Sequence, residues 1–488
     1  MKTTTRKHYI DHWDAEDVDA WESGNEKIAK RNLIWSIFAE HVGFSVWSIW
    51  SVMVLFMPMA KYHIDPAGKF YLLAVPTLVG AILRILYTVA PAKFGGRNFT
   101  IFSALALLVP TVLTLYFMLN PASYTTYLIV AAFAGLGGGN FASSMTNINA
   151  FYPQRLKGWA LGLNAGGGNI GVPVIQLLGL GVIAFVSKTD PTLLCAVYLV
   201  LCALAAVGAA LFMDNLGNQK SNLSAMGESL RFRQSWVMAF LYIGTFGSFI
   251  GFSFAFGQVL QISFMADLTH SGALKATPQM QGAAALHAAQ IAFIGPLLGS
   301  ISRPFGGKLA DKIGGGKVTL YTFIAMVFAG GILVTTGVMD DGLKGAATTG
   351  QMTAYVIGFI LLFVLSGIGN GSTYKMIPSI FEAKAQSKDE LSYTEKTLWS
   401  RSMSGALIGF AGAIGALGGV LINVVLRASY VGQAKSATNA FWVFMAFYVV
   451  CAIVTWAVFL RRPSTRAIHA VPGAKRAAVE DDSVAITA

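Results

Sequence analysis

The chain alternates long apolar runs with short polar stretches along most of its length. A helix needs about 17 to 25 apolar residues to cross a bilayer, and a lipid-exposed backbone must satisfy its hydrogen bonds internally. Twelve runs meet that length, near residues 33–60, 70–92, 98–118, 126–150, 159–186, 191–213, 236–264, 286–307, 318–338, 352–380, 401–427 and 438–460. We therefore expect an all-α integral membrane protein with twelve transmembrane helices.

The most polar internal stretch lies between the sixth and seventh runs and divides the chain into two sets of six helices. The N-terminal segment has no apolar signal-peptide core, so we expect it to stay uncleaved in the cytoplasm. The predicted divisions are an N-terminal tail, a first bundle, a linker, a second bundle and a C-terminal tail, at residues 1–31, 32–213, 214–235, 236–461 and 462–488.

Composition and charge agree with a membrane location. The 488 residues are 55% hydrophobic and 12% charged, whereas soluble domains carry roughly 25% charged residues. Lys and Arg resist translocation, so their loops are expected in the cytoplasm. Of the 35 basic residues, only seven fall in the alternate loops: Lys61, Lys69, Lys188, Lys275, Lys344, Arg427 and Lys435. Both termini are thus predicted to be cytoplasmic, and the net charge of +12 indicates topology and not nucleic-acid binding.

Two arginines lie inside apolar runs at matching places in the two halves. Arg84 precedes Gly95-Gly96-Arg97 by 11 residues, and Arg303 precedes Gly314-Gly315 by the same spacing. Eleven helical residues rise about 16 Å, half of a hydrocarbon core, so both guanidinium groups are expected near the midplane. An arginine there costs about 3 kcal/mol or more, and one pocket shared by the two halves would explain both.

The acidic residues are poor partners for these arginines. Nearly all of them fall in tails or beside loops, and only Glu40 lies plainly inside a run, on the expected cytoplasmic side of the first helix. Since arginine stays charged and offers a flat fork of donors, a mobile planar anion is the preferred counter-ion. The alternative is neutralisation by a buried carboxylate.

Other residues near the same level can complete an anion site. The amides of Asn164 and Asn169 need partners, and Asn169 can donate to an anion. The aromatic side chains of Phe141, Tyr242 and Phe246 can exclude water, with the Tyr242 hydroxyl as a further donor. A dry pocket of this kind favours a small, weakly hydrated anion over phosphate or sulfate.

Glycine-rich segments also repeat between the halves. Gly135–Gly139 in the fourth run matches Gly367–Gly371 in the tenth, which indicates a duplicated six-helix unit. A second pair lies in the fifth and eleventh runs, where small residues allow close helix contacts, for static packing or for gating. The positions in question are Gly162, Gly166, Gly171, Gly409, Gly412 and Gly415.

The segments around Gly139–Tyr152, Tyr242–Phe252 and Gly369–Ile377, with both arginines and the glycine-rich fifth and eleventh runs, resemble bacterial nitrate/nitrite porters of the major facilitator superfamily. The resemblance extends from about Ile28 to Arg461. It implies nitrate and nitrite as substrates, moved by alternating access. It also implies a site in which Arg84 and Arg303 clamp the anion, Asn169 and Tyr242 hydrogen-bond it, and Phe141 and Phe246 sandwich it.

One departure leaves the coupling open. Glu40 and His41 put ionisable groups in the first run, where the exchangers of this family are apolar. Nitrate/nitrite antiport is the first hypothesis, and nitrate/proton symport through Glu40 or His41 is the alternative. Either residue can instead be structural.

Other classes of function find little support in the sequence. Cys195, Cys202 and Cys451 all fall in apolar runs and are expected to pack or face lipid, and no metal-ligand spacing, haem pair or nucleotide loop is present. We therefore expect a transporter and no enzyme, with no cofactor and no metal. Its partners are the anions and the lipid bilayer, with no nucleic acid and a monomeric state.

Overall fold

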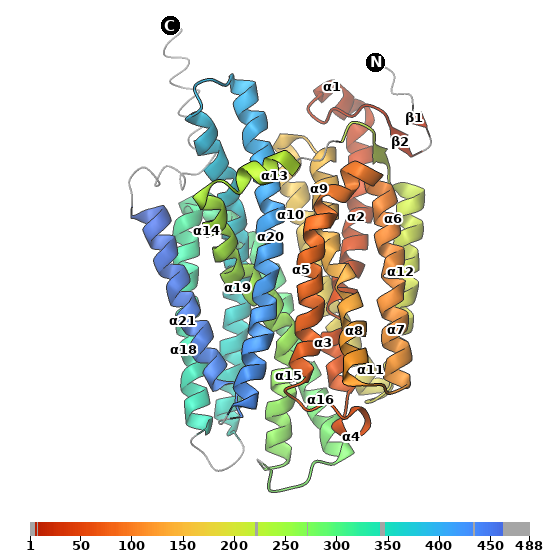
Figure 1. Cartoon of the computed structure of the whole chain (residues 1–488), viewed down its shortest axis with the longest axis vertical. Coiled ribbons are helices and arrows are strands. Elements are labelled where there is room, and N and C mark those ends of the chain that lie inside the picture. The colour runs from red at the N-terminus through yellow and green to blue at the C-terminus, as the bar shows by residue number, and fades with distance from the viewer. Residues whose placement is uncertain are drawn as a thin grey trace.

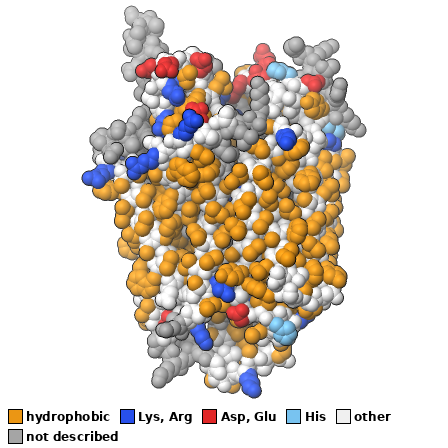
Figure 2. All heavy atoms as spheres, in the orientation of Figure 1, with side chains coloured by type: hydrophobic (Ala, Val, Ile, Leu, Met, Phe, Trp, Pro, Cys, Tyr) orange, Lys and Arg blue, Asp and Glu red, His pale blue; other side chains and the backbone are white. Residues whose placement is uncertain are grey.

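The computed structural model describes residues 5–6, 8–219, 223–270, 272–341, 347–432 and 435–461 (Figure 1). Within these ranges, twelve helices are long and apolar enough to cross a membrane, which confirms the predicted number. Side chains of hydrophobic residues cover the middle of the molecule, and charged side chains gather toward its two ends (Figure 2). The predicted C-terminal tail, 462–488, lies outside the described residues.

The first six spans are built from helical segments that are continuous or broken by a single turn. Their bounds are α2 Glu26–Trp47 with α3 Trp50–Met53 and η2 Val54–Phe56; α5 Lys69–Phe94; α6 Gly96–Ala106 with α7 Leu108–Leu119; α8 Tyr124–Ala134 with α9 Leu136–Phe151; α10 Gln154–Asn169 with α11 Gly171–Phe185; and α12 Thr192–Phe212. A short helix, α4 Met59–Tyr62, joins the first two spans.

The last six spans repeat this plan. Their bounds are α14 Arg233–Tyr242 with η3 Ile243–Gly247 and α15 Ser248–Leu268; α16 Pro278–Ala292 with α17 Ile294–Ile313; α18 Gly315–Asp341; α19 Thr349–Gln386; α20 Tyr393–Val431; and α21 Thr438–Thr455 with η4 Trp456–Leu460. Between the two sets of spans lies one further helix, α13 Leu223–Ser229.

The N-terminal segment is folded against the first six spans. Strand β2 (Tyr9–Ile10) pairs antiparallel with β1 (Thr5–Arg6) and parallel with β3 (Asn215–Leu216), which follows the sixth span. After a short helix α1 (Val18–Ala20) and the π-turn η1 (Trp21–Asn25), α2 begins. The first transmembrane helix therefore begins before residue 32, at which the sequence pattern starts the first bundle.

Two polar contacts hold this N-terminal segment. The carboxylate of Asp214 accepts hydrogen bonds from Arg31 Nη2 at 2.6 Å and from Asn32 Nδ2 at 2.9 Å. The indole of Trp13 donates to the Phe151 carbonyl at 3.2 Å. This N-terminal segment lies at the same end of the molecule as the N-terminus (Figure 1).

The two arginine-bearing helices end in the same way, as the repeated Gly-Gly motif predicts. Gly95 follows α5 with φ 88° and ψ 139°, and Gly314 follows α17 with φ 92° and ψ 133°. Residues with side chains rarely adopt a φ in this range, so glycine is needed at both turns. The matching dihedral angles support a common structural unit in the two halves.

Glycines bring a neighbouring helix close to each arginine-bearing helix. A Cβ on Gly138 would lie 2.8 Å from the Cα of Gly80, and a Cβ on Gly367 would lie 2.2 Å from the carbonyl of Gly299. Gly80 and Gly299 each stand four residues before an arginine, so the close contacts lie one turn from Arg84 and Arg303. The glycine ladders of the fourth and tenth spans therefore position the arginines.

The halves meet along two seams, α5 against α20 and α11 against α16. Several contacts lie toward the end of the molecule opposite the N-terminal strands, where α4 and α16 are found (Figure 1). Gln176 Nε2 donates to the Ser253 carbonyl at 2.8 Å, Gln258 Nε2 donates to the Pro66 carbonyl at 3.1 Å, and the Phe70 and Tyr430 rings stack at 5.5 Å. These contacts join the two halves on that side.

Candidate functional site

Arg84 is fully buried and reaches both halves. Its Nε donates to the carbonyl of Gly138 and its Nη1 to the carbonyl of Gly412 in α20, each at 3.0 Å. The third nitrogen, Nη2, is buried with no hydrogen-bond partner. The guanidinium thus keeps free donors inside the protein although two carbonyls fix its orientation.

Arg303 occupies the corresponding place in the second half. It is buried, its Nη1 has no hydrogen-bond partner, and its Cζ lies 5.4 Å from the centre of the Tyr374 ring. Tyr242 lies close enough to both arginines for their charges to act on its hydroxyl group. Arg84 of the first half and Arg303 of the second half therefore both lie near Tyr242, and the shared anion site stays a prediction.

Within the described part of the chain, no carboxylate forms an ion pair with either arginine. The four ion pairs found in the described ranges all involve other residues. A cation buried without a fixed counter-ion is costly, and the free Nη donors are suited to the oxygens of an anion. The preferred hypothesis from the sequence, a mobile counter-ion, fits this geometry better than a buried carboxylate partner.

The aromatic rings expected at the site lie beside the Arg84 guanidinium. The rings of Phe141 and Phe246 stack at 6.4 Å from each other, and the Cζ of Arg84 lies 4.8 Å and 4.9 Å from their centres. Tyr242 stacks on Phe246 at 5.2 Å. In this structure the two phenylalanines flank the Arg84 guanidinium, and they exclude water from one side of the site.

The local structure of the seventh span explains how Tyr242 and Phe246 are presented. The π-turn η3 starts directly after Tyr242 and includes Phe246. A π-turn inserts one residue into a helix and is often found at functional sites, because it re-aims the side chains that follow. A Cβ on Gly415 would lie 2.5 Å from the Tyr242 ring, so α20 packs directly behind it.

Glu40 is closer to the site than the sequence pattern indicates. Its carboxylate accepts hydrogen bonds from the hydroxyl of Ser144 and from Asn164 Nδ2, the latter at 2.6 Å, and its other oxygen is buried without a partner. Both Arg84 and Arg303 act on it electrostatically. A carboxylate off the midplane was expected, but Glu40 belongs to the same polar network as the arginines.

His41 is held differently. Its Nδ1 lies 3.1 Å from the carbonyl of Gly167, and its own carbonyl would lie 2.3 Å from a Cβ on Gly171. The ring therefore binds the backbone of α10, and this contact agrees with the structural interpretation of His41.

Asn169 is buried at the end of α10 with neither its Oδ1 nor its Nδ2 bonded. Such an amide is unusual, since buried polar atoms nearly always have partners. The preceding residue, Gly168, packs against the Glu40 carboxylate, because a Cβ there would lie 2.3 Å from Oε1. Asn169 thus adjoins the polar network and keeps free donor capacity.

The glycines of the fifth and eleventh spans have different surroundings. Gly171, Gly409 and Gly415 lie at close contacts, and the carbonyl of Gly412 accepts the Arg84 bond. Gly162 and Gly166 have nothing within 4 Å of an added Cβ, so neither is at a close helix contact in this structure. The predicted role of these two glycines in packing or gating stays a prediction.

Sequence reasoning gave no role to two residues of the site. The Tyr374 hydroxyl is buried without a partner beside Arg303, and Ser144 bonds to Glu40. Tyr374 lies three residues after Gly371 in α19, and Ser144 lies three residues after Phe141 in α9. Both Gly371 and Phe141 were singled out in the sequence. The spacing of one helical turn is the signal that could have found them.

The three cysteines are buried and therefore pack inside the protein. No group of three His, Cys, Asp or Glu side chains within the described ranges could hold a metal ion. The side chains described at the site offer fixed cations, amides and hydroxyls.

Comparison with known proteins agrees with this geometry. Residues 41–390 match the family model described as Major Facilitator Superfamily. The nitrate/nitrite transporter NarU of Salmonella typhimurium is 32% identical over 93% of this chain and 97% of its own length. The probable nitrate/nitrite antiporter NarK2 of Thermus thermophilus is 29% identical over 95% of this chain and 99% of its own. A D-xylose-proton symporter shares the fold, with 13% identity, a TM-score of 0.60 and coverage of 89% of this chain and 98% of its own.

Twelve spans in two similar halves, with a polar site between them, define a membrane transporter and not an enzyme. The chain belongs to the Major Facilitator Superfamily and, within it, to the bacterial nitrate/nitrite porters.

Proposed function

We propose that this protein exchanges nitrate and nitrite across the cytoplasmic membrane by alternating access, as a monomer with both termini in the cytoplasm. The observation that carries the proposal is the pair of buried arginines, one from each half, each with an Nη that has no partner. The names of the relatives and their coverage of nearly the whole chain support the choice of anions.

In this proposal Arg84 and Arg303 form a clamp that holds the anion between them. The planar fork of a guanidinium matches the flat oxygens of nitrate and nitrite. Asn169 and Tyr242 add donors, and Phe141 and Phe246 keep the site dry, which favours weakly hydrated anions. One chain supplies every one of these residues, so a monomer is sufficient.

The clamp also explains why exchange is coupled. Two cations about 6 Å apart at an effective dielectric of ~20 repel each other by roughly 3 kcal/mol. That is enough to disfavour closure of the empty site by about a hundredfold. An anion between the arginines removes the repulsion, so only the loaded carrier closes and reopens on the other side.

The contacts between the halves support a state that is closed toward the outside. The bonds from Gln176 and Gln258 and the Phe70–Tyr430 stack lie at the end opposite the N-terminal strands, which we assign to the outer face. Rocking about the Arg84–Gly412 contact would break these bonds and open that face.

Efflux from reconstituted vesicles tests the exchange. Vesicles loaded with nitrite should release it rapidly when nitrate is outside and at least tenfold more slowly when no external anion is present. Equal release in the two conditions would eliminate obligatory exchange, although nitrate and nitrite could still be the substrates.

The surroundings of Glu40 favour a second candidate, nitrate/proton symport. A carboxylate beside two arginines can neutralise one of them, and protonation would release that charge for the anion. Ser144 and Asn164 hold Glu40 in place for such a role. The same contacts are also compatible with a structural carboxylate in an antiporter.

A pH gradient separates the two candidates. Symport predicts that an acid outside drives nitrate uptake into vesicles without internal anion and that Glu40→Gln abolishes this uptake but spares exchange. Antiport predicts no uptake into such vesicles at any gradient. His41→Gln tests the other candidate carrier, and loss of the acid-driven uptake in that variant alone would assign the proton to His41 and not to Glu40.

A further inference from the structure

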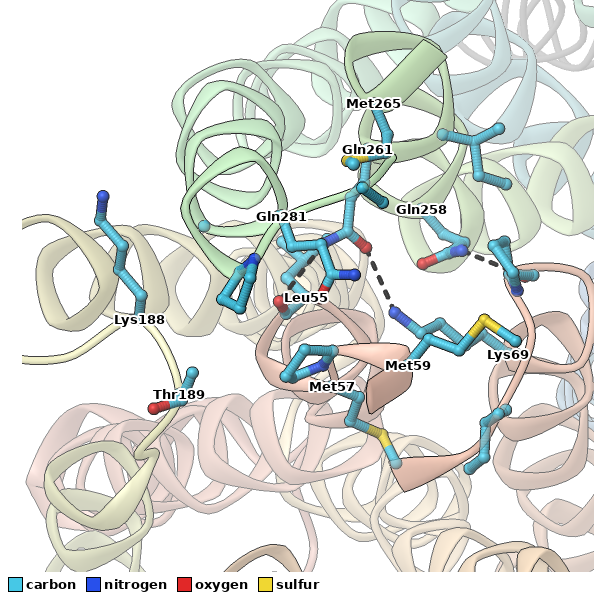
Figure 3. A pocket seen from close by; sticks show the side chains of 17 residues that line it. Leu55, Met57, Met59, Lys69, Lys188, Thr189, Gln258, Gln261, Met265 and Gln281 are labelled. Carbon is cyan, nitrogen blue, oxygen red and sulfur yellow. Dashed lines mark hydrogen bonds between the residues drawn. The ribbon is translucent and has the colours of Figure 1, made fainter. Parts of the chain in front are cut away.

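A cavity lined by apolar residues and a few polar side chains lies at the end of the molecule opposite the N-terminal strands, away from the arginines. It has a volume of about 200 Å³ and is lined by residues of the first and second spans, the fifth-to-sixth loop and the seventh and eighth spans (Figure 3). A cavity of this size exceeds by far the space that one water molecule needs. It can therefore hold a small ion with several waters.

The ionisable side chains that line the cavity are basic. Two of its lining residues are lysines, Lys69 and Lys188, and no Asp or Glu lines it. Neither lysine takes part in any of the ion pairs found in the described ranges. The cavity therefore attracts anions.

Lys69 is the buried member of the pair. Its side chain is almost inaccessible, and its Nζ donates to the Val54 carbonyl at 2.7 Å and to Gln261 Oε1 at 3.4 Å. An ammonium has three donors, so one remains, and the longer bond to Gln261 is weak. An anion in the cavity can accept from both.

Two glutamines complete the lining with unused acceptors. The Oε1 atoms of Gln258 and Gln281 are buried without partners. Figure 3 shows Gln281 between Lys69 on one side of the cavity and Lys188 on the other. Waters on an anion can donate to these oxygens while the anion accepts from Lys69, so a hydrated ion satisfies the polar groups of the lining.

This chemistry differs from that of the arginine site. Lysine is a compact, strongly hydrated point charge, whereas arginine is weakly hydrated and pairs with planar oxygens. The outer cavity combines lysines with amides, and the inner site combines arginines with phenylalanines. The outer cavity therefore suits an anion that still carries water, and the inner one suits the same anion after dehydration.

We propose that this cavity is a second binding site, in which Lys69 holds a small, partly hydrated oxyanion that Lys188 attracts at the rim. The identity of that anion as nitrate or nitrite rests on the proposed function. Binding there weakens the Lys69–Gln261 bond, which joins α5 of the first half to α15 of the second. Occupation of the outer site thus loosens the closed outer face before the anion moves inward.

Transport kinetics from each face test the site. In vesicles of known orientation, Lys69→Gln should raise the KM for nitrate entering from the α4–α16 face about tenfold, with kcat within about twofold. Lys188→Gln should raise the same KM less, by about threefold. The KM from the opposite face should stay unchanged in both variants.

Lys435→Gln is the matched control, because Lys435 is an exposed lysine that does not line the cavity. It should change neither KM. Equal KM changes on both faces, or none in either cavity variant, would overturn the outer site. If Lys69→Gln does not fold, the change in KM of Lys188→Gln alone tests the outer site, because Lys188 is exposed and its substitution should not disturb folding.

Calorimetry with nitrate separates this proposal from the proposed function. Purified Arg303→Gln protein should retain a weak nitrate site that disappears in Arg303→Gln/Lys69→Gln. Loss of all binding in Arg303→Gln alone contradicts the outer site. Failure of wild-type protein to transport nitrate would instead remove the proposed substrate, while Lys69-dependent anion binding would still establish the cavity as a site.

Discussion

Arg84 of the second span donates through Nη1 to the carbonyl of Gly412 in the eleventh span at 3.0 Å. A cation from one half is thus tied to the backbone of the other half at the level of the candidate site. Because the acceptor is a carbonyl, the bond orients the guanidinium without neutralising it. The arginine keeps both its charge and a free donor for an anion.

Two uncompensated cations predict that nitrate stabilises the folded protein. We expect nitrate to raise the Tm of the wild type, since it relieves the repulsion between the arginines and binds only the folded state. Arg303→Gln should remove most of this rise, leaving only the small part that the weaker Lys69 site contributes, and should leave the anion-free protein at least as stable as the wild type. Thermal unfolding in detergent with and without nitrate measures both effects.

Arg427→Gln is the control for that experiment, because Arg427 lies 4.2 Å from the Tyr71 ring and outside the arginine site. It should keep the nitrate-dependent rise. A rise of wild-type size in Arg303→Gln would show that nitrate stabilises the protein mainly somewhere other than between the arginines.

Asn169 should matter for binding and not for stability. Its amide has no partner in the structure, so Asn169→Ala removes no internal hydrogen bond and should leave the Tm unchanged. The KM for nitrate should rise about tenfold, as expected for one hydrogen bond to a charged ligand. Initial rates of nitrate uptake and a melting curve give the two values.

Asn423→Ala provides the opposite case. The Nδ2 of Asn423 donates to the Gly419 carbonyl at 2.8 Å within α20, so this variant should lose stability with little change in KM. The role proposed for Asn169 fails if its variant behaves like that of Asn423.

The Glu40 network predicts a coupled pair of substitutions. Asn164→Ala removes a donor from a buried carboxylate and should destabilise the protein by about 2 kcal/mol. In a Glu40→Gln background the same change should cost clearly less, because no buried charge loses its partner. Unfolding of the two single variants and the double variant measures the coupling, and strictly additive effects would show that Glu40 does not depend on Asn164.

The fifth span offers a contrast between two glycines. Gly171→Ala would bring a Cβ to 2.3 Å from the His41 carbonyl, so we expect a loss of about 1 to 3 kcal/mol from the strain of overpacking. Gly162→Ala has open space and should be neutral or slightly stabilising, since alanine favours helix. Comparable losses in both variants, measured by thermal unfolding, would mean that the packing differs from the structure described.

Much of this architecture follows from the sequence because lipid imposes strong rules. Runs of apolar length predict the spans, and the equal spacing from Arg84 and Arg303 to their glycine turns predicts the repeat. What the sequence did not reveal depends on which side of a helix faces which neighbour. The bond from Asn164 to Glu40 and the ring of Tyr374 under Arg303 arise from rotation and packing of the helices, which one sequence does not specify. For the same reason Gly162 and Gly171, alike in sequence context, have opposite surroundings.

The most direct test of the account is nitrate uptake into nitrite-loaded vesicles by the wild type and by Arg84→Lys and Arg303→Lys. Lysine keeps the charge but loses the planar fork, so each substitution should lower uptake about a hundredfold while the protein stays folded. Arg427→Lys should transport like the wild type. Uptake that survives in either of the two site variants at near wild-type rates would contradict the claim that both arginines hold one shared anion.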